Sequence, residues 1–275
     1  MLKRIITGAC YVVVLVAFFL FREFVDYRIF NILTYAFAVI GTVELVKMLK
    51  PFSVGKFRAL IVAYSVIAPL LFLAIEYFLF KGFGYLGVIA LALLFFAVIA
   101  VYFIVTKTEK NKFLPSVLGL FYPMVFMTFA LMANELEHGF IALICAFVIS
   151  PVSDTFAYFT GMAIGGKKLC PKISPKKTWA GAIGGTLGGA ISAVLVYFIF
   201  NPQINFGYPI LFFVVLGLVA SVVNIFGDLF ESIIKRKAGV KDSGKILPGH
   251  GGILDRIDGT MFVMVIVYFA FLIVG

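Results

Sequence analysis

The chain has 275 residues, of which 63% are hydrophobic and 13% are charged, and its formal net charge is +10. Soluble domains are close to half apolar and a quarter charged, so this composition excludes a single water-soluble domain. A lipid bilayer accepts that much apolar surface, and the sequence therefore predicts an integral membrane protein.

Apolar runs of helical length follow one another along the chain, separated by charged or Pro- and Gly-rich breaks. Lipid cannot satisfy backbone hydrogen bonds, so each run is predicted to be a transmembrane helix and the fold class to be all-α and polytopic. The first run ends in Phe and Leu at residues 18–21, which favours a retained span over a cleaved signal peptide. The nine predicted spans are residues 5–21, 28–46, 57–80, 84–106, 113–133, 138–163, 178–200, 207–230 and 258–274.

The basic residues are divided unevenly between the two sides of this topology. Of the 23 lysines and arginines, 20 fall on the side that holds the N-terminus and the loops after spans two, four, six and eight. The positive-inside rule therefore predicts a cytoplasmic N-terminus and an outer C-terminus. Topology and attraction to anionic headgroups explain the net charge, so nucleic-acid binding is not expected.

The chain is expected to have two parts. Residues 1–135 contain spans one to five, and residues 136–275 contain spans six to nine with two long cytoplasmic loops, at residues 165–178 and 231–256. These loops are rich in Lys, Gly and Pro, and long ordered loops are more often functional than simple connectors. The second part is therefore predicted to be catalytic.

Several carboxylates lie inside predicted spans, in the halves that face the cytoplasm. Asp154 is in span six and Asp228 is in span eight. A carboxylate within a transmembrane helix is costly, so it usually faces a cavity, a partner or an ion. An ion pair between helices remains an alternative for both residues, and more so for Asp154.

Helical spacing places further polar residues beside Asp228. If the helix continues past residue 230, Ser232 is at i+4, while Lys235 and Arg236 are at i+7 and i+8. All of them then share one face with Asp228. An acid, a hydroxyl and two cations would line one wall of a site.

The last span is short in apolar residues, so its helix is predicted to begin earlier, near Leu254. Asp255 and Asp258 are then three residues apart on one face in the first turn, where the helix dipole favours carboxylates. His250 is expected at the tip of the Pro- and Gly-rich bend that precedes them.

Three carboxylates, Asp228, Asp255 and Asp258, are thus expected to converge beside several cations. Mg²⁺ prefers oxygen ligands and bridges carboxylates to substrate phosphates, while cationic side chains neutralise the remaining charge. Phosphate transfer depends mostly on positioning and electrostatics, so a Cys or Ser nucleophile is not needed. The pattern predicts a magnesium-assisted reaction on phosphates.

The second loop resembles a known signature. Residues 232–258 read SIIKRKAGVKDSGKILPGHGGILDRID, which resembles the signature of phosphatidate cytidylyltransferases, also called CDP-diacylglycerol synthases. Residues 153–161, 174–181 and 227–232 are similar to family segments in the same order, except that Ala180 stands where the family usually has an acidic or amide residue. This resemblance covers the C-terminal half, and spans one to five match only in hydrophobicity.

The resemblance implies the transfer of CMP from CTP to phosphatidate, giving CDP-diacylglycerol and pyrophosphate, with Mg²⁺ held by the three carboxylates and a monovalent cation such as K⁺ sharing the site. It implies that the phosphates are neutralised by Lys235, Arg236, Lys241 and Arg256. The residues implied to close over the nucleotide or the lipid headgroup are Ser174, Lys176, Lys177 and Thr178. Residues assigned to the site without a firm role are Asp154, Asp242 and His250, and Ser232 is placed among the substrate-binding residues. For His250, a phosphate donor and a turn residue both remain open.

The resemblance also implies a homodimer that contacts membrane lipid. In a prokaryote the enzyme would lie in the cytoplasmic membrane, with its active site facing the cytoplasm, where CTP is present.

Two rival functions remain. A transporter or channel would need polar groups through the whole membrane thickness, whereas the intramembrane acids gather toward the predicted cytoplasmic side. Another CTP-using membrane enzyme, such as a polyprenol or phytol kinase, would release CDP rather than pyrophosphate.

Overall fold

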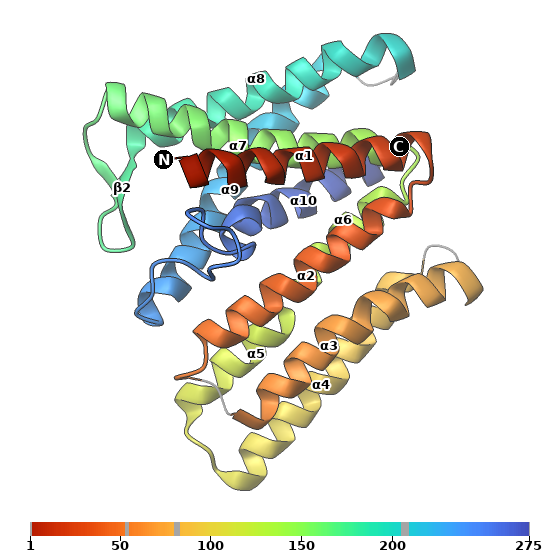
Figure 1. Ribbon diagram of the computed structural model, residues 1–275, viewed down its shortest axis with the longest axis vertical. Helices are drawn as coiled ribbons and strands as arrows, with labels where there is room; N and C mark the ends of the chain where they lie inside the picture. The colour runs from red at the N-terminus through yellow and green to blue at the C-terminus, as the bar shows by residue number, and fades with distance from the viewer. Residues whose placement is uncertain (1, 53–54, 80–82, 205–208, 275) are drawn as a thin grey trace. The chain divides into compact units, whose positions relative to one another are not determined.

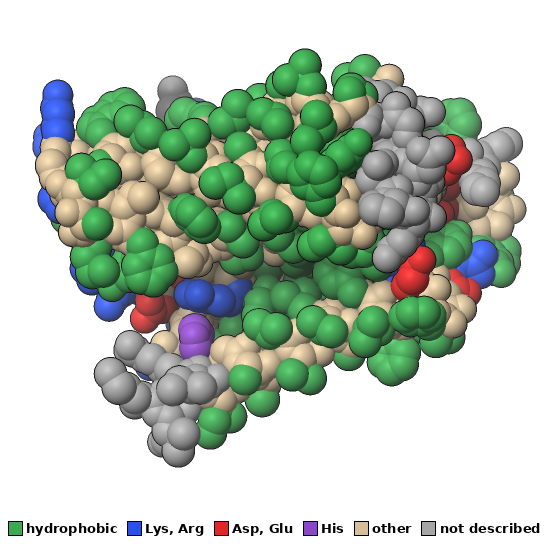
Figure 2. Space-filling view, turned by 90° about the horizontal axis from the view of Figure 1, so that it is seen from above, with side chains coloured by type: hydrophobic (Ala, Val, Ile, Leu, Met, Phe, Trp, Pro, Cys, Tyr) green, Lys and Arg blue, Asp and Glu red, His purple; other side chains and the backbone are tan. Residues whose placement is uncertain are grey.

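The computed structural model describes residues 2–52, 55–79, 83–204 and 209–274. Within these ranges, nine helical stretches are long and apolar enough to cross a membrane. The prediction of an all-α protein with nine spans is confirmed, although the predicted ends at residues 80 and 207 lie outside the described residues. Hydrophobic side chains cover most of the face shown in Figure 2, as expected for a surface in contact with lipid.

The chain divides into two compact units that interleave in sequence. The first contains Met1–Leu131 and the loop segment Lys237–Asp255, and the second contains Met132–Arg236 and Arg256–Gly275. The segment between the last two helices therefore groups with the N-terminal helices. The expected catalytic role of residues 136–275 stays a prediction.

The first unit is built from antiparallel helices with short connections (Figure 1). Hydrophobic side chains such as Phe30, Leu45, Ile61, Tyr64 and Phe72 form its core. Its elements are α1 (Leu2–Phe24), α2 (Ile29–Met48), α3 (Gly55–Ala74), the π-helical turn η1 (Ile75–Leu79), α4 (Gly84–Thr106), the 3₁₀ turn η2 (Lys110–Lys112), α5 (Phe113–Phe121) and most of α6 (Met124–Asn134).

The fifth span is divided into α5 and α6, which meet at Tyr122 and Pro123. Proline has no N–H, so it fits directly before the first residue of α6, where an N–H would have no partner in the helix. The two short helices together cover Phe113–Asn134, which is long enough for one span.

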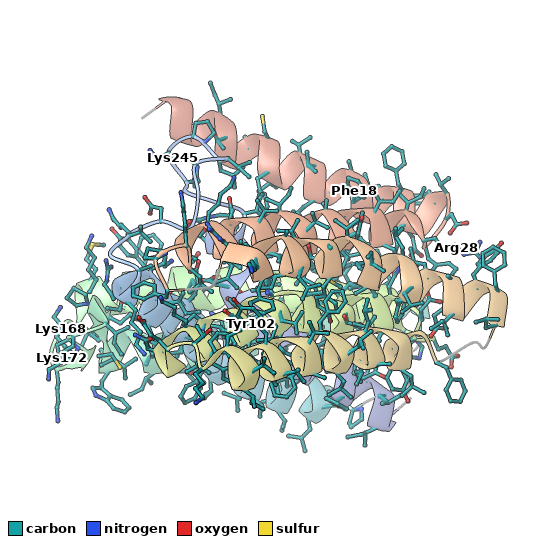
Figure 3. All side chains as sticks on the ribbon, turned by 90° about the horizontal axis from the view of Figure 1, so that it is seen from below. Phe18, Arg28, Tyr102, Lys168, Lys172 and Lys245 are labelled. Carbon is teal, nitrogen blue, oxygen red and sulfur yellow. The ribbon has the colours of Figure 1, made fainter. Side chains whose placement is uncertain are left out.

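Arg28 and Lys245 lie at opposite ends of the first unit (Figure 3). The predicted topology requires this arrangement, because it places these two cations on opposite sides of the membrane. Which end faces the cytoplasm stays a prediction.

The second unit contains four long helices and a small sheet (Figure 1). The helices are α7 (Gly139–Ala163), α8 (Trp179–Ile204), α9 (Ile210–Lys237) and α10 (Leu254–Val274). The helix of Asp228 does continue past residue 230, and the last helix begins at Leu254, so both predictions are confirmed.

A β-hairpin that the sequence did not predict lies in the first long loop. Strands β1 (Lys168–Cys170) and β2 (Ser174–Thr178) are antiparallel, with Lys168 opposite Thr178. Gly165 and Gly166 have φ angles of +66° and +87°, which let the chain turn sharply as it leaves α7. The hairpin lysines Lys168 and Lys172 project at one end of this unit (Figure 3).

Helices α7 and α8 pack against each other through glycines of α8 that include Gly181 and Gly185, four residues apart. A Cβ atom on Gly181 would lie 2.7 Å from the carbonyl oxygen of Ala157, and one on Gly185 would lie 2.8 Å from that of Ser153. The backbones therefore approach each other without room for a methyl group. This contact fixes α7, which carries Asp154, against α8.

We expect Gly185→Ala to destabilise the protein by about 1–3 kcal/mol, because the added methyl group must push two backbones apart. The change is measured as the midpoint of thermal unfolding in detergent micelles.

Gly8→Ala is the matched control, since Gly8 is also helical and its Cβ would make ordinary contact, 3.4 Å from the His250 ring. Alanine favours a helix over glycine by about 1 kcal/mol, so this variant should unfold at the wild-type temperature or above. An unchanged or higher midpoint for Gly185→Ala would contradict the packing argument.

Candidate active site

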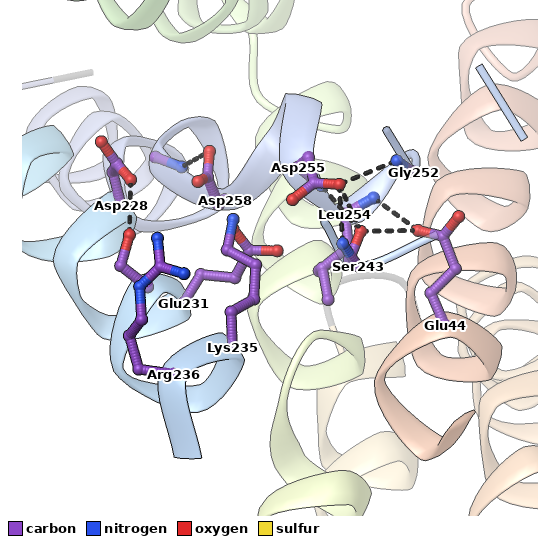
Figure 4. A network of polar contacts seen from close by, with 12 residues as sticks. Glu44, Asp228, Glu231, Lys235, Arg236, Ser243, Gly252, Leu254, Asp255 and Asp258 are labelled. Atoms are coloured by element: carbon purple, nitrogen blue, oxygen red, sulfur yellow. Dashed lines mark hydrogen bonds and ion pairs between the residues drawn. The ribbon is translucent and has the colours of Figure 1, made fainter. Parts of the chain in front are cut away.

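Charged side chains gather on the C-terminal part of α9 and the start of α10, within the second unit (Figure 4). We call this group the acid–base cluster, and its members are Lys177 of β2, Asp228, Glu231 and Lys235 of α9, and Asp258 of α10. On α9, Glu231 follows Asp228 by three residues and precedes Lys235 by four, so all three lie on neighbouring turns of one face.

Asp228 joins α9 to the hairpin. Its Oδ2 forms an ion pair with Nζ of Lys177, and its Oδ1 accepts a hydrogen bond of 3.2 Å from Oγ of Ser232. The Lys177 and Asp228 side chains keep 24% and 28% of their surface exposed, so both remain partly accessible. The structure thus brings together three residues that the sequence assigned to the site.

Glu231 was not predicted as a site residue. Its side chain is fully buried, forms an ion pair with Lys235 and lies beside the carboxyl group of Asp258. Two carboxyl groups in contact repel each other unless a proton or a cation lies between them. The sequence signal was present, because Glu231 lies within one helical turn of both Asp228 and Lys235.

Asp154 is held by an amide and not by a cation. Its Oδ1 accepts a hydrogen bond of 2.8 Å from Nδ2 of the buried Asn224 on α9, and Oδ1 of Asn224 accepts one of 2.6 Å from Ser150 Oγ. The ion pairs of the described residues do not include Asp154, so the alternative of a helix-to-helix ion pair does not apply to it there. Its charge does interact with those of Asp228 and Lys177.

The remaining predicted residues of the second unit hold the hairpin or face solvent. Nε of Arg236 donates to the carbonyl oxygen of Ile173 at 3.3 Å, between the two strands. Oγ1 of Thr178 accepts a hydrogen bond of 3.0 Å from the N–H of Gly181, which caps α8. Lys176 and Arg256 are exposed, and Ser174 is partly buried at the start of β2.

Four predicted residues belong to the first unit. Asp255 Oδ2 accepts hydrogen bonds from the N–H groups of Ser243 and Gly252, both at 2.8 Å, so Asp255 closes the loop that precedes α10. The other three are Lys241 and Asp242, which are exposed, and His250, which is partly buried. Along α10, Asp255 is in the first turn, whereas Asp258 begins the second turn and not the first.

The metal assignment stays a prediction. The described part of the chain contains no group of three His, Cys, Asp or Glu side chains positioned to hold a metal ion. The donor chemistry nevertheless suits Mg²⁺, because Asp258 lies in contact with Glu231 and within electrostatic reach of Asp228. Several carboxylate oxygens close together create a negative potential that favours binding of a cation.

An apolar groove of about 560 Å³ lies between the halves of α9 and α10 that are distant from these acids. Its lining includes Phe212, Val215, Val219 and Phe269 and contains no ionisable side chain. The lining of the groove is thus apolar, in contrast to the acid–base cluster.

Together, membrane-spanning helices and a partly exposed cluster of carboxylates and ammonium groups define a polytopic membrane protein with a site suited to phosphate groups. The model of the cytidylyltransferase family matches residues 2–274, and the chain belongs to this family. The match also corrects the expectation that spans one to five share only hydrophobicity with the family, since it includes them.

Individual relatives are named phosphatidate cytidylyltransferase. The protein of Bacillus subtilis (strain 168) is 34% identical over 279 residues, covering 98% of this chain and 97% of that protein. That of Brucella abortus biovar 1 (strain 9-941) is 39% identical over 166 residues, covering 60% of this chain and 59% of that protein. That of Thermotoga maritima is 35% identical over 175 residues, covering 62% and 65%. The match to the Brucella protein thus spans less than two thirds of its length.

Proposed function

We propose that this protein transfers the CMP moiety of CTP to phosphatidate, producing CDP-diacylglycerol and pyrophosphate. The observation that carries the proposal is the acid–base cluster, in which Lys177 of the hairpin meets Asp228 of a membrane helix at a partly exposed position. The name of the relatives and the signature at residues 232–258 support the same reaction.

In the proposed reaction an oxygen of the phosphatidate phosphate attacks the α-phosphorus of CTP. The bond from that phosphorus to the bridging oxygen of the β-phosphate breaks, and pyrophosphate leaves with its charge. Lys177, Lys235 and Arg256 would neutralise the phosphates, together with Arg236 and Lys241. Such charge neutralisation and alignment account for most of the catalysis in phosphate transfer.

We also propose that Mg²⁺ is held by Asp228, Asp255 and Asp258, and that K⁺ is a further candidate at the same site. When bound, Mg²⁺ would neutralise the charge that develops on the phosphate oxygens. The Glu231 carboxylate beside Asp258 adds to the negative potential that would attract a cation. Lys177, which pairs with Asp228 here, would then be available to a phosphate.

The proposed location follows from the substrates. Phosphatidate keeps its acyl chains in the bilayer and its phosphate at the interface, whereas CTP is too highly charged to enter lipid. A multi-pass protein in the cytoplasmic membrane, with its site facing the cytoplasm, would meet both substrates. A homodimer is the proposed assembly.

The purified protein, incubated with CTP, phosphatidate and Mg²⁺ in mixed micelles, should yield CDP-diacylglycerol and an equal amount of pyrophosphate. Release of CDP would instead indicate a kinase acting on a lipid alcohol. Ion flux in liposomes without CTP, together with no lipid product, would favour the transporter alternative.

Asp258→Asn should lower turnover on the order of 100-fold or more, because it removes a charge from the proposed metal site. Turnover and the Mg²⁺ concentration for half-maximal activity are measured together. Asp26→Asn is the control, since Asp26 is exposed and its Oδ1 accepts a hydrogen bond from the N–H of Arg28, outside the acid–base cluster. Equal turnover in the two variants would rule out the metal role of Asp258.

Two adjacent lysines on β2 offer a matched pair. Lys177 contacts Asp228, whereas Lys176 is exposed. Lys177→Met should reduce kcat/KM for CTP more than tenfold, and Lys176→Met by less than about threefold, because only the first removes a cation from the cluster. If Lys176→Met caused the larger loss, the exposed face of the hairpin would be the substrate-binding face.

A further inference from the structure

Glu44 is a buried carboxylate near the C-terminal end of an apolar helix. It lies on α2 with 2% of its surface exposed, within the first unit. Its Oε1 accepts a hydrogen bond of 3.2 Å from the N–H of Ile253. Its Oε2 accepts one of 2.9 Å from the N–H of Leu254 (Figure 4). These partners are 209 and 210 residues further along the chain.

This carboxylate lies at the N-terminal end of α10, which begins at Leu254. The first N–H groups of a helix have no partner within the helix, and the helix dipole makes its N-terminus favourable for an anion. Capping residues usually come from the same segment. Here the cap comes from α2, so Glu44 stabilises the first N–H groups of α10.

Two glycines make room for this contact. A Cβ atom on Gly244 would lie 2.7 Å from Cδ of Glu44, and a Cβ atom on Gly252 would lie 2.5 Å from the same atom. Any larger residue at either position would displace the carboxylate. Two separate parts of the loop, at Gly244 and at Gly252, therefore lie directly against the Glu44 carboxylate.

Ser243 connects Glu44 with Asp255. Its Oγ lies 3.2 Å from Oε2 of Glu44 and 2.9 Å from Oδ2 of Asp255, and it is also 3.3 Å from the N–H of Asp255. Asp255 additionally accepts the N–H of Ser243 and of Gly252. Moving Glu44 would thus shift the three groups that fix the Asp255 carboxylate.

A buried charge without a cation is expensive to retain. The ion pairs found among the described residues do not include Glu44, so the hydrogen bonds and the helix terminus are what stabilise it there. We propose that Glu44 is a positioning residue: it holds the loop of residues 243–254 and thereby aims Asp255 for cytidylyl transfer. The inference rests on the proposed function of the site.

The test compares Glu44→Gln with Glu76→Gln. Glu76 is the matched control, because its Oε1 accepts a hydrogen bond of 2.6 Å from the N–H of Gly84 and so also caps a helix, α4, from another element. Both substitutions preserve shape and remove one charge from a helix start. Only the first touches the loop that holds Asp255.

Three quantities are measured in detergent: turnover per folded protein, the Mg²⁺ concentration for half-maximal activity, and the rate of tryptic cleavage at the exposed Lys241 and Lys245. For Glu44→Gln we expect turnover to fall and the half-maximal Mg²⁺ concentration to rise, each by about tenfold or more, as for residues that orient metal ligands. Cleavage in the loop should accelerate several-fold. Glu76→Gln should leave the Mg²⁺ dependence and the cleavage rate unchanged.

The inference is overturned if Glu44→Gln keeps the wild-type Mg²⁺ dependence and cleavage rate, or if Glu76→Gln changes both as much. If Glu44→Gln does not fold, Ser243→Ala replaces it in the test, because this substitution removes only the link between Glu44 and Asp255. Turnover should then fall, while the half-maximal Mg²⁺ concentration and the cleavage rate should rise. An inactive wild-type protein would refute the proposed function, whereas the cleavage comparison would still test the positioning of the loop.

Discussion

A carboxylate inside an apolar helix must find hydrogen-bond donors or a cation, since lipid and hydrophobic side chains offer neither. Four acids on the transmembrane helices meet this requirement in three ways. Glu44 uses backbone N–H groups, Asp154 uses the amide of Asn224, and Asp228 and Glu231 use lysines. The positions of the hairpin and of the loop before α10 follow from these needs, because both supply donors to acids on other elements.

These pairings also hold the second unit together. Helices in a membrane gain no hydrophobic driving force from contact with each other, so close packing and polar contacts must supply the stability. Glycine packing joins α7 to α8, the Asn224 amide joins α7 to α9, and the Lys177–Asp228 pair joins the hairpin to α9. Charged groups of the candidate site are therefore also structural groups, which limits how far any of them can move.

The features that the sequence predicted are local ones. A transmembrane span is a run of apolar residues, and the start of α10 at Leu254 follows from the length of the last span and from acids at a helix start. Asp228 and Ser232 meet because they are four residues apart on one helix. Sequence spacing is enough for such contacts, since a helix fixes the geometry of its own neighbours.

The features that were missed depend on distant partners or lack a clear pattern. Residues 168–178 do not alternate between apolar and polar side chains, so nothing in them indicated a hairpin. The fully buried Glu231 carboxylate contacts Asp258 on another helix. The role of Glu44 could not be inferred, because a residue in the second span gives no sign that it caps the ninth.

The distance in sequence between Glu44 and its donors matters during synthesis. At roughly 5–20 residues per second, the 209 residues that separate Glu44 from Ile253 take about 10–40 s to be translated. Helix α2 must therefore enter the membrane before the N–H donors of Glu44 exist. The Glu44 carboxylate stays without these two donors until nearly the whole chain has been made. The first unit is complete only after α9 has been inserted, so the first helices to be made are among the last to reach their final packing.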